Sequence, residues 1–372
     1  MNNSIDLKIM KGGINMIITT TGYFGTGSSA ITNMFQEFSN IDTNQGEYEI
    51  RLLYDPDSIS DLEYYLVENP HRQITSYAIK RFIKSINYNS NPWANHHYEK
   101  ICNGNFKKMS FHYIDELCDL KYKGYSYIDL LDKGIFYTFL NRCYMKIKKT
   151  IFNVSGYRSN VLPETLISSK TQQYGGTYDE EKFLKVTQKF IGNFLDYCNK
   201  SNKEIIMLDQ FVPPTNIARY IRYIPNTQKI KIFIVDRDPR DLYVTCKYFY
   251  KTQGIPCSNP DEFCQWFLWT RGQGKKYEDP DCVMRIQFED LIYKYDDTRE
   301  KIIKFCGLPE EMCINKKKYF NPELSLQNTQ VWNRYPETSK EIEYIKEHLS
   351  EYCYDFENFS IKPNIQNGKM FE

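Results

Sequence analysis

The chain has 372 residues, of which 41% are hydrophobic and 26% are charged. This balance predicts a globular protein with a large buried core and argues against disorder over most of the chain. The formal net charge is +1, so the overall charge does not indicate a protein that wraps nucleic acid or lies on a membrane surface. We therefore expect any anionic ligand to be bound by a local site.

The first predicted elements are a strand, a glycine-rich loop and a helix. Ile14 to Thr20 is a short β-branched apolar run, which predicts a strand. The turn Gly22 to Gly27 follows it, and Ser28 to Phe38 has helical spacing. A second strand is predicted for Tyr48 to Tyr54, closed by Asp55-Pro56.

The composition changes between residues 58 and 200, where polar, aromatic-rich segments show helical spacing and no long apolar strand occurs. The alternation of strands and helices then resumes. Ile230 to Val235 is apolar at nearly every position, as in a strand covered on both faces in the middle of a parallel sheet. The other elements predicted here are strands at Glu204 to Leu208 and Val283 to Phe288, and helices at Asn216 to Tyr223, Asp241 to Tyr250, Thr298 to Cys306 and Ile342 to Glu351.

These elements predict an α/β fold in which a central parallel β-sheet is flanked by helices, of the P-loop nucleotide-binding type. We expect a single domain over residues 1–372, with a core made of 14–57 and 201–345. The segment of about 58–200 is predicted to be a mainly helical insertion, whose loops are candidates to contact a substrate.

The loop Gly22-x-x-Gly25-x-Gly27-Ser28-Ser29 follows a strand and precedes a helix, a position where backbone N–H groups and a helix dipole converge on an anion. A Walker A loop would have lysine after its last glycine, but here that residue is Ser28, which argues against an ordinary NTPase or kinase. The glycine spacing does not fit a dinucleotide-binding loop either. The loop alone predicts a phosphate site, with a plain structural turn as the alternative.

A second motif follows the apolar strand, in the sequence Asp236-Arg237-Asp238-Pro239-Arg240-Asp241-Leu242-Tyr243-Val244-Thr245. Arg237 leaves the carboxyl end of a central strand, which is where open α/β sheets bind ligands. With a proline at the helix start, Arg237 and Thr245 can face one pocket and bind a phosphate together. The alternative for Arg237 is an ion pair with Asp241 or Asp290.

This segment resembles the 3′-phosphate motif of the sulfotransferases that use 3′-phosphoadenosine 5′-phosphosulfate (PAPS). Arg237, Pro239, Arg240, Asp241 and Thr245 match that pattern. The N-terminal loop is then similar to the 5′-phosphosulfate loop of the family, and the resemblance covers residues 14–39 and 204–309. It implies PAPS as donor and 3′-phosphoadenosine 5′-phosphate (PAP) as product. The residues it implies for nucleotide binding are Tyr23, Phe24, Gly25, Thr26, Gly27, Ser28, Ser29, Arg237 and Thr245.

The chain departs from the family at two catalytic positions. The loop lysine is absent, since the matching position is about Gly25, and Lys247, Arg51 or the backbone amides are the candidates to replace it. The usual base after the strand Ile205 to Leu208 is also absent. Asp209 is the titratable group in that turn, so we expect it to be the general base, with loop capping as its alternative role. His96, His97 and His112 are further candidates.

The sequence therefore predicts a sulfotransferase that acts on a hydroxyl acceptor, with a carbohydrate favoured by the aromatic-rich insertion. Two alternatives stay open, a protein that binds the nucleotide without turnover and a divergent P-loop kinase. Ser325 to Arg334 is predicted to close over the nucleotide or to be an exposed loop. The sequence predicts nothing about the oligomeric state.

The eleven cysteines include no Cys-x-x-Cys pair, so we expect neither a disulfide framework nor a bound metal. No apolar run reaches the roughly 18 residues that a membrane helix needs, and the first fifteen residues lack the apolar stretch of a signal peptide. These features predict a cytoplasmic protein without an integral membrane segment or a nucleic-acid partner.

Overall fold

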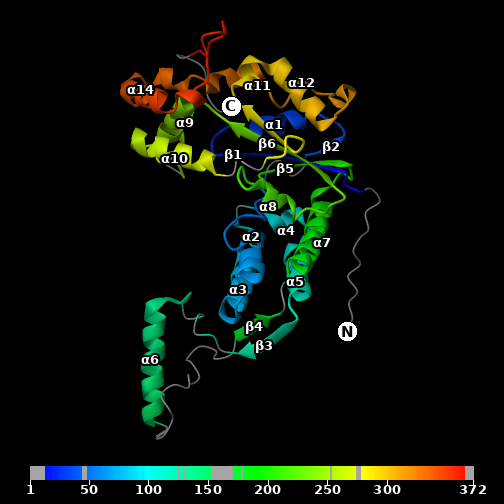
Figure 1. The fold of residues 1–372 in the computed structure, drawn as a ribbon, viewed down its shortest axis with the longest axis vertical. Coiled ribbons are helices and arrows are strands. Elements are labelled where there is room, and N and C mark those ends of the chain that lie inside the picture. Colours follow the sequence, from blue (N-terminus) through cyan, green and yellow to red (C-terminus); the bar gives the residue numbers. More distant parts are fainter. Residues whose placement is uncertain are drawn as a thin grey trace.

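The computed structural model describes residues 13–43, 48–94, 96–124, 126, 128, 131–151, 171–176, 179–251, 254–273 and 278–364. Its centre is a five-stranded parallel sheet in the order β2-β5-β1-β6-β7 (Figure 1). Helices cover the sheet, so the predicted α/β class with a parallel sheet is confirmed. The strands of this sheet are β1 (Met16–Gly22), β2 (Ile41–Asp42), β5 (Ile205–Asp209), β6 (Lys229–Asp236) and β7 (Val283–Gln287).

Alternate residues of the central strands enter two separate cores. On β1, Ile17 belongs to one buried cluster, whereas Met16 and Ile18 belong to the other. On β6, Ile232 and Ile234 face one way and Phe233 and Val235 the other, because successive side chains of a strand point to opposite faces. Both faces of the sheet are therefore buried, as the continuous apolar run of β6 predicts.

One face of the sheet is covered by α1 (Ser29–Phe35), α11 (Asp290–Tyr293) and α12 (Tyr295–Cys306). A further cluster joins α9 (Pro239–Thr245), α10 (Pro260–Gly272) and α14 (Ser339–His348) beside the sheet (Figure 1). A π-helical turn, Cys246–Tyr250, continues α9, and α13 (Pro322–Ser325) precedes a series of short 3₁₀ turns.

The other face is covered by the mainly helical insertion and by α8 (Ile217–Ile221). Two arginines of α8 and its C-cap connect this helix to the insertion, since Arg219 and Arg222 both form ion pairs with the buried Glu63, at 2.9 and 2.8 Å. The helices between β2 and β5 are α2 (Ile59–Glu63), α3 (Arg72–Asn89), α4 (Tyr98–Ile101), α5 (Phe106–Leu117), α6 (Gly134–Ile151) and α7 (Glu180–Cys198), with a π-helical turn at Tyr64–Glu68.

The insertion also contains an antiparallel pair, β3 (Leu120–Gly124) and β4 (Thr171–Gly175), that the sequence does not predict. Figure 1 shows this hairpin beyond the ends of α3 and α5, with α6 further out and away from the sheet. Among the described residues, no helix combines the length and the apolar character needed to cross a bilayer.

Two predicted elements differ from the structure. Tyr48 to Tyr54 is a turn and not a strand, with a single isolated bridge between Glu49 and Asp209. The predicted helix from Ser28 ends at Phe35, three residues early, because the chain there bonds to a distant segment. The N–H of Ser39 donates to the carbonyl of Met312 at 2.9 Å, and Phe38 forms an isolated bridge with Cys313.

Candidate functional site

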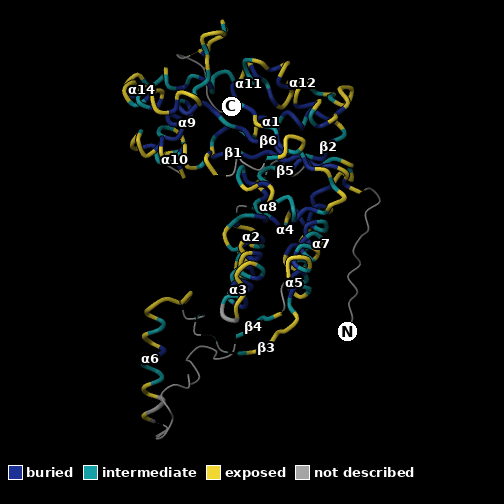
Figure 2. Tube along the Cα trace, viewed as in Figure 1, coloured by how far each residue is buried: buried dark blue, intermediate teal, exposed yellow. Residues whose placement is uncertain are grey.

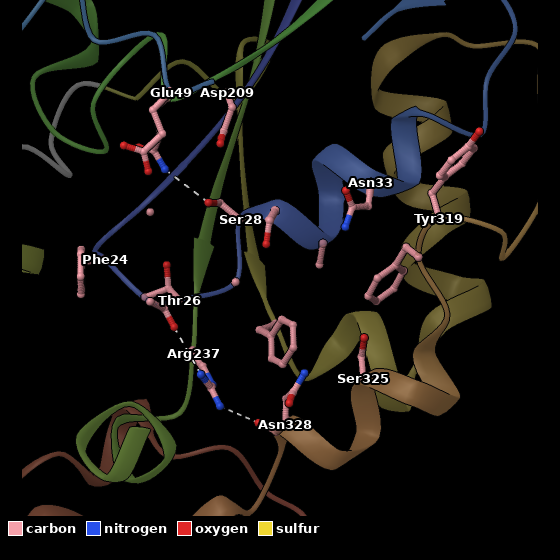
Figure 3. A pocket seen from close by; sticks show the side chains of 18 of the residues that line it. Phe24, Thr26, Ser28, Asn33, Glu49, Asp209, Arg237, Tyr319, Ser325 and Asn328 are labelled. Atoms are coloured by element: carbon pink, nitrogen blue, oxygen red, sulfur yellow. Dashed lines mark hydrogen bonds between the residues drawn. The ribbon is translucent and has the colours of Figure 1, made fainter. Parts of the chain in front are cut away.

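A cavity of about 570 Å³ lies at the carboxyl ends of the three adjacent strands β5, β1 and β6 (Figure 3). It contains both segments that the sequence singles out, the loop after β1 and the residue after β6. Its lining is Gly22, Phe24, Gly25, Thr26, Gly27, Ser28, Ser29, Ala30, Asn33, Glu49, Arg51, Asp209, Gln210, Arg237, Tyr250, Phe288, Lys318, Tyr319, Phe320, Asn321, Leu324, Ser325 and Asn328.

The loop after β1 exposes its backbone to the cavity because two of its residues are glycines with positive φ. Gly27 has φ +89°, and a Cβ there would lie 2.5 Å from the Phe288 ring. Gly25 has φ +67°, and a Cβ would lie 3.2 Å from Tyr250. The N–H groups of residues 25–29 form no hydrogen bond to any described residue. This run of N–H groups is suited to binding an anion.

The two serines at the end of the loop add hydroxyl groups to the same wall. Ser28 accepts a hydrogen bond from the Gln210 side chain at 3.3 Å, and Ser29 is exposed to the cavity. The α1 helix that follows has only seven residues. The contribution of its dipole is therefore smaller than the sequence suggests, and the loop N–H groups and Arg237 are further sources of positive potential in the cavity.

Arg237 is buried at the opposite end of the cavity from Asp209, with the loop between them (Figure 3). Its guanidinium donates to the backbone carbonyl of Gly25 at 3.3 Å and to that of Asn328 at 2.5 Å. It also lies 5.4 Å from the centre of the Phe288 ring. The two predicted anion sites therefore lie next to each other in one cavity and not on separate faces of the molecule.

The neighbours of Arg237 in the motif fix the surrounding backbone. The buried Asp241 carboxylate accepts hydrogen bonds from the N–H groups of Gln330 and Val331, which ties α9 to the segment that contains Asn328. Burial raises the pKa of Asp241, and the nearby Arg237 opposes this shift. Asp290 pairs instead with Lys294 at 2.9 Å.

Arg240 has a related structural role. It pairs with the buried Asp238 at 2.6 Å, and its guanidinium lies 4.3 Å from the centre of the Trp332 ring. Asp238 also caps α9 by accepting from the N–H of Arg240. The match of these residues to the motif is thus explained by the way they hold Arg237 and the segment around Asn328 in place.

Two of the residues predicted to bind nucleotide have side chains outside the cavity lining. Tyr23 is buried beneath Arg271 and accepts a hydrogen bond from Arg285 at 3.1 Å. Thr245 is also buried, and its hydroxyl has no hydrogen-bond partner among the described residues. An unpaired buried hydroxyl on the helix that follows Arg237 is compatible with a phosphate-binding role, which stays a prediction.

Two carboxylates line the end of the cavity opposite Arg237 (Figure 3). Asp209 accepts a hydrogen bond from the Thr20 hydroxyl at 2.9 Å. Burial raises the pKa of Asp209 to about 6, although the Thr20 hydrogen bond and Arg51 lower it. Glu49 is exposed and pairs with Arg51 at 2.7 Å. Asp209 therefore has a pKa suited to accepting a proton near neutral pH.

The structure distinguishes between the candidates to replace the missing loop lysine, because only some of them line the cavity. Arg51 lines the cavity, whereas Lys247 pairs with Glu341 at 2.6 Å and lies outside the lining. Lys318 is a further cation on the cavity wall that the sequence does not indicate. A side chain at position 25 is disfavoured, because φ is +67° and a Cβ there would make a tight contact with Tyr250, at 3.2 Å.

The three candidate histidines lie outside the cavity lining. His96 bridges Asp55, at 2.8 Å, and the backbone carbonyl of Glu49, at 2.9 Å. His112 pairs with Glu116 at 3.2 Å, and the His97 ring lies against Tyr48. Among the described residues, no group of three or more His, Cys, Asp or Glu side chains is arranged to hold a metal ion.

The sequence does not identify Glu49, Lys318, Tyr319 or Phe288 as cavity residues. The last two supply aromatic faces, and Tyr319 and Phe320 reach the cavity because their N–H groups bond to the buried Glu37 carboxylate, at 3.4 and 3.2 Å. No local motif marks these positions. The predicted loop from Ser325 to Arg334 does contribute, since Ser325 and Asn328 line the cavity.

No protein-family model matches the chain, and no curated protein matches it. Among solved structures, a sulfotransferase domain from the curacin biosynthetic pathway has 11% sequence identity to the chain and a TM-score of 0.34, over 85% of this chain and 78% of that domain. Retinol dehydratase in complex with androsterone and the inactive cofactor PAP has 14% identity and a TM-score of 0.32, over 92% and 83% of the two chains. A sulfotransferase of Mycobacterium tuberculosis H37Rv has 12% identity and a TM-score of 0.31, over 91% and 77%. At these values the likenesses decide nothing about function, and the fold class rests on the sheet topology.

Proposed function

We propose that the protein is a sulfotransferase that moves the sulfuryl group of PAPS to a hydroxyl acceptor. The observation that carries this proposal is the common cavity of the loop after β1 and Arg237. A nucleotide with phosphate at both its 5′ and 3′ positions uses two anion sites at once, whereas ATP has no group for the second. The motif around Arg237 supports the same ligand class.

In this proposal the N–H groups of residues 25–29 bind the 5′-phosphosulfate and Arg237 binds the 3′-phosphate. The Arg237 guanidinium already points toward the loop, where it bonds to the Gly25 carbonyl. A 3′-phosphate would compete for this guanidinium with the carbonyls of Gly25 and Asn328, and a charged acceptor forms stronger hydrogen bonds than neutral carbonyls do. Phe288 and Tyr319 offer aromatic faces on which a purine can stack.

The reaction needs a base for the acceptor hydroxyl and positive charge for the departing phosphate. Asp209 takes the proton as the acceptor oxygen forms a bond to sulfur, and the bond from sulfur to the 5′-phosphate oxygen breaks to release PAP. The loop N–H groups stabilise the negative charge on the leaving oxygen. Arg51, within electrostatic reach of Asp209, is the candidate cation in place of the family lysine.

We propose a carbohydrate as the acceptor, because the insertion is rich in tyrosine and phenylalanine, and aromatic faces stack on sugar rings. The test is transfer of labelled sulfate from PAPS to a panel of oligosaccharides. Label on any glycan supports an active enzyme and excludes a protein that only binds the nucleotide.

The absence of the loop lysine favours that second candidate, a nucleotide-binding protein without turnover. PAP binding with no label on any hydroxyl compound, water included, would support it. A third candidate, a divergent kinase, predicts phosphate transfer from ATP that persists in Arg237→Ala, because Arg237 has no group to bind on ATP. Transfer of that kind would overturn the proposed function.

A further inference from the structure

Helix α6 carries apolar side chains that the rest of the described chain does not cover. Ile135, Phe136, Phe139, Leu140 and Ile147 are between 43% and 85% exposed. Figure 2 shows exposed residues along this helix, which stands away from the sheet. We call these five residues the α6 face. Exposed aromatic and aliphatic side chains in such number mark a binding surface.

The helical spacing gathers these residues on one side of α6. Phe136, Leu140 and Ile147 follow one another at intervals of four and seven residues, so they form one row along the helix. Ile135 and Phe139 begin the neighbouring row, which continues with Arg142 and Lys146, at intervals of four, three and four residues. Both of these basic residues are exposed. The apolar face is thus bordered by positive charge.

The opposite side of the helix is less exposed. Asn141 is buried, and Tyr137, Thr138 and Met145 are partly buried. The five residues of the α6 face therefore lie on the side of the helix that is more open to solvent.

Comparison with α7 shows that this exposure is specific to α6. The two helices have similar lengths, 18 and 19 residues, and both are amphipathic. The apolar residues of α7, such as Phe190 and Phe194, are buried, and its sequence carries acidic residues at its start. From Lys133 to Ile151, in contrast, the sequence contains no aspartate or glutamate.

We propose that α6 binds the surface of an anionic lipid membrane, with its apolar face among the acyl chains and headgroups and its basic residues at the lipid phosphates. Helices with a basic polar side and a face of phenylalanine, leucine and isoleucine bind in this way. A second copy of the chain is a poorer occupant, because each copy would bring only positive charge to the contact. The net charge of the whole chain is only +1, because acidic residues elsewhere offset the positive charge of this helix.

The test is co-sedimentation of the full chain with vesicles of phosphatidylcholine, with and without phosphatidylserine. We expect sedimentation with the vesicles that contain phosphatidylserine, decreasing as salt is raised. The double variant Phe136→Asp/Phe139→Asp should weaken this binding at least about tenfold. Trp269→Asp, the same change at an exposed ring on α10, should leave it unchanged.

A second double variant, Arg142→Gln/Lys146→Gln, tests the electrostatic part. It should weaken binding to vesicles with phosphatidylserine and flatten the salt dependence, while leaving any binding to pure phosphatidylcholine unchanged. Circular dichroism and thermal unfolding of each variant establish that it is folded.

Three results would overturn the proposal. One is that the native chain does not sediment with phosphatidylserine vesicles, and another is that the folded α6 variants sediment as well as the native chain does. The third result is a dimer in analytical ultracentrifugation that Phe136→Asp/Phe139→Asp abolishes. The last result would assign the face to a second copy. None of these measurements involves nucleotide, so their outcome is independent of the proposed sulfuryl transfer.

Discussion

The sheet with its loops and the helical insertion differ in how they use aromatic and charged side chains. In the sheet half, charge is concentrated at the ends of adjacent strands, where Arg237, Asp209 and the loop after β1 line one cavity. In the insertion, the buried Glu63 pairs with Arg219 of α8 and so joins the insertion to the sheet half, and helix α6 leaves an apolar face exposed. In our two proposals the first half carries out sulfuryl transfer and the second half carries the membrane-binding face.

This difference suggests that nucleotide binding and turnover depend on a few positions around the cavity and are insensitive to changes on α6. The predictions below test that separation, beginning with the largest expected effect. Three of them pair a change at the cavity with a similar change elsewhere in the chain.

Asp209→Asn should lower the rate of transfer from PAPS by about 10²- to 10³-fold without changing the affinity for PAP. Asparagine keeps an acceptor for the Thr20 hydroxyl but cannot take a proton. Stability should not decrease. Because the folded pKa of Asp209 is above its unfolded value, the ionised carboxylate opposes folding at neutral pH, and asparagine removes this effect. The measurements are steady-state kinetics, calorimetry and thermal unfolding.

Asp196→Asn on α7 is the matched control, because burial also raises the pKa of that carboxyl group in the insertion. It should leave transfer unchanged. Glu49→Gln should reduce transfer less than Asp209→Asn does, since Arg51 already pairs with Glu49. A larger loss in Glu49→Gln would show that the base has been assigned to the wrong carboxylate.

Arg237→Ala should weaken PAP binding about 100-fold, because the variant loses a charge-assisted contact to the 3′-phosphate. Lys247→Ala removes a cation outside the cavity and should have little effect. Isothermal titration calorimetry measures both. Equal losses of PAP affinity in the two variants would mean that the affinity depends on the overall positive charge of the protein and not on a specific contact with Arg237.

Gly27→Ala should lower the free energy of unfolding by about 2 to 4 kcal/mol, the sum of the strain of positive φ and of overlap with Phe288. Gly104 in the insertion has φ +77° and open space around it, so Gly104→Ala measures the strain alone, at about 1 to 2 kcal/mol. Denaturant unfolding gives both values. A cost in Gly27→Ala no larger than in Gly104→Ala would contradict the close approach of Phe288 to the loop.

Transfer should be independent of pH above about 6 and fall about tenfold per unit below it. The rate falls toward acid pH because Asp209 accepts a proton only when it is ionised, and the pKa of Asp209 is about 6. A pH–rate profile of transfer tests this, and Asp209→Asn should lose the acidic limb. An acidic limb that persists in Asp209→Asn would assign the titration to another group.

The smallest effect is expected from the insertion. Phe136→Asp/Phe139→Asp should leave the affinity for PAP unchanged within about twofold, since no residue of α6 lines the cavity. Calorimetry on the two proteins side by side checks this. A clear loss of PAP affinity in this variant would mean that the two halves of the molecule are not independent.

Much of the sheet half is predictable from local sequence, because its signals are local. The apolar runs predict β1, β5, β6 and β7, and the glycine spacing and the residue after β6 predict two segments that do line the cavity. Asp209 is predicted as the base because the resembled family has its base at the end of this strand and Asp209 is the titratable group in that turn. These features depend on residues within about ten positions of each other, so no tertiary information is needed to find them.

The parts that local patterns do not predict depend on distant contacts. Tyr48 to Tyr54 has a strand-like composition, but only Glu49 pairs with the sheet, so Glu49 was not expected in the cavity. Tyr319 reaches the cavity through Glu37, which is 282 residues away in the sequence. The exposure of the α6 face is not predictable either, because α6 and α7 are both amphipathic, and this periodicity does not show which apolar face the rest of the chain covers.

The most direct test of the central claim compares the binding of PAP and AMP, two nucleotides that differ by the 3′-phosphate, to the native chain and to Arg237→Ala. We predict that PAP binds the native chain with a dissociation constant of about micromolar order and about 100-fold more tightly than AMP. In Arg237→Ala the two nucleotides should bind with similar affinity. Equal binding of PAP and AMP to the native chain, or a preference for PAP that survives in Arg237→Ala, would contradict one nucleotide spanning both anion sites.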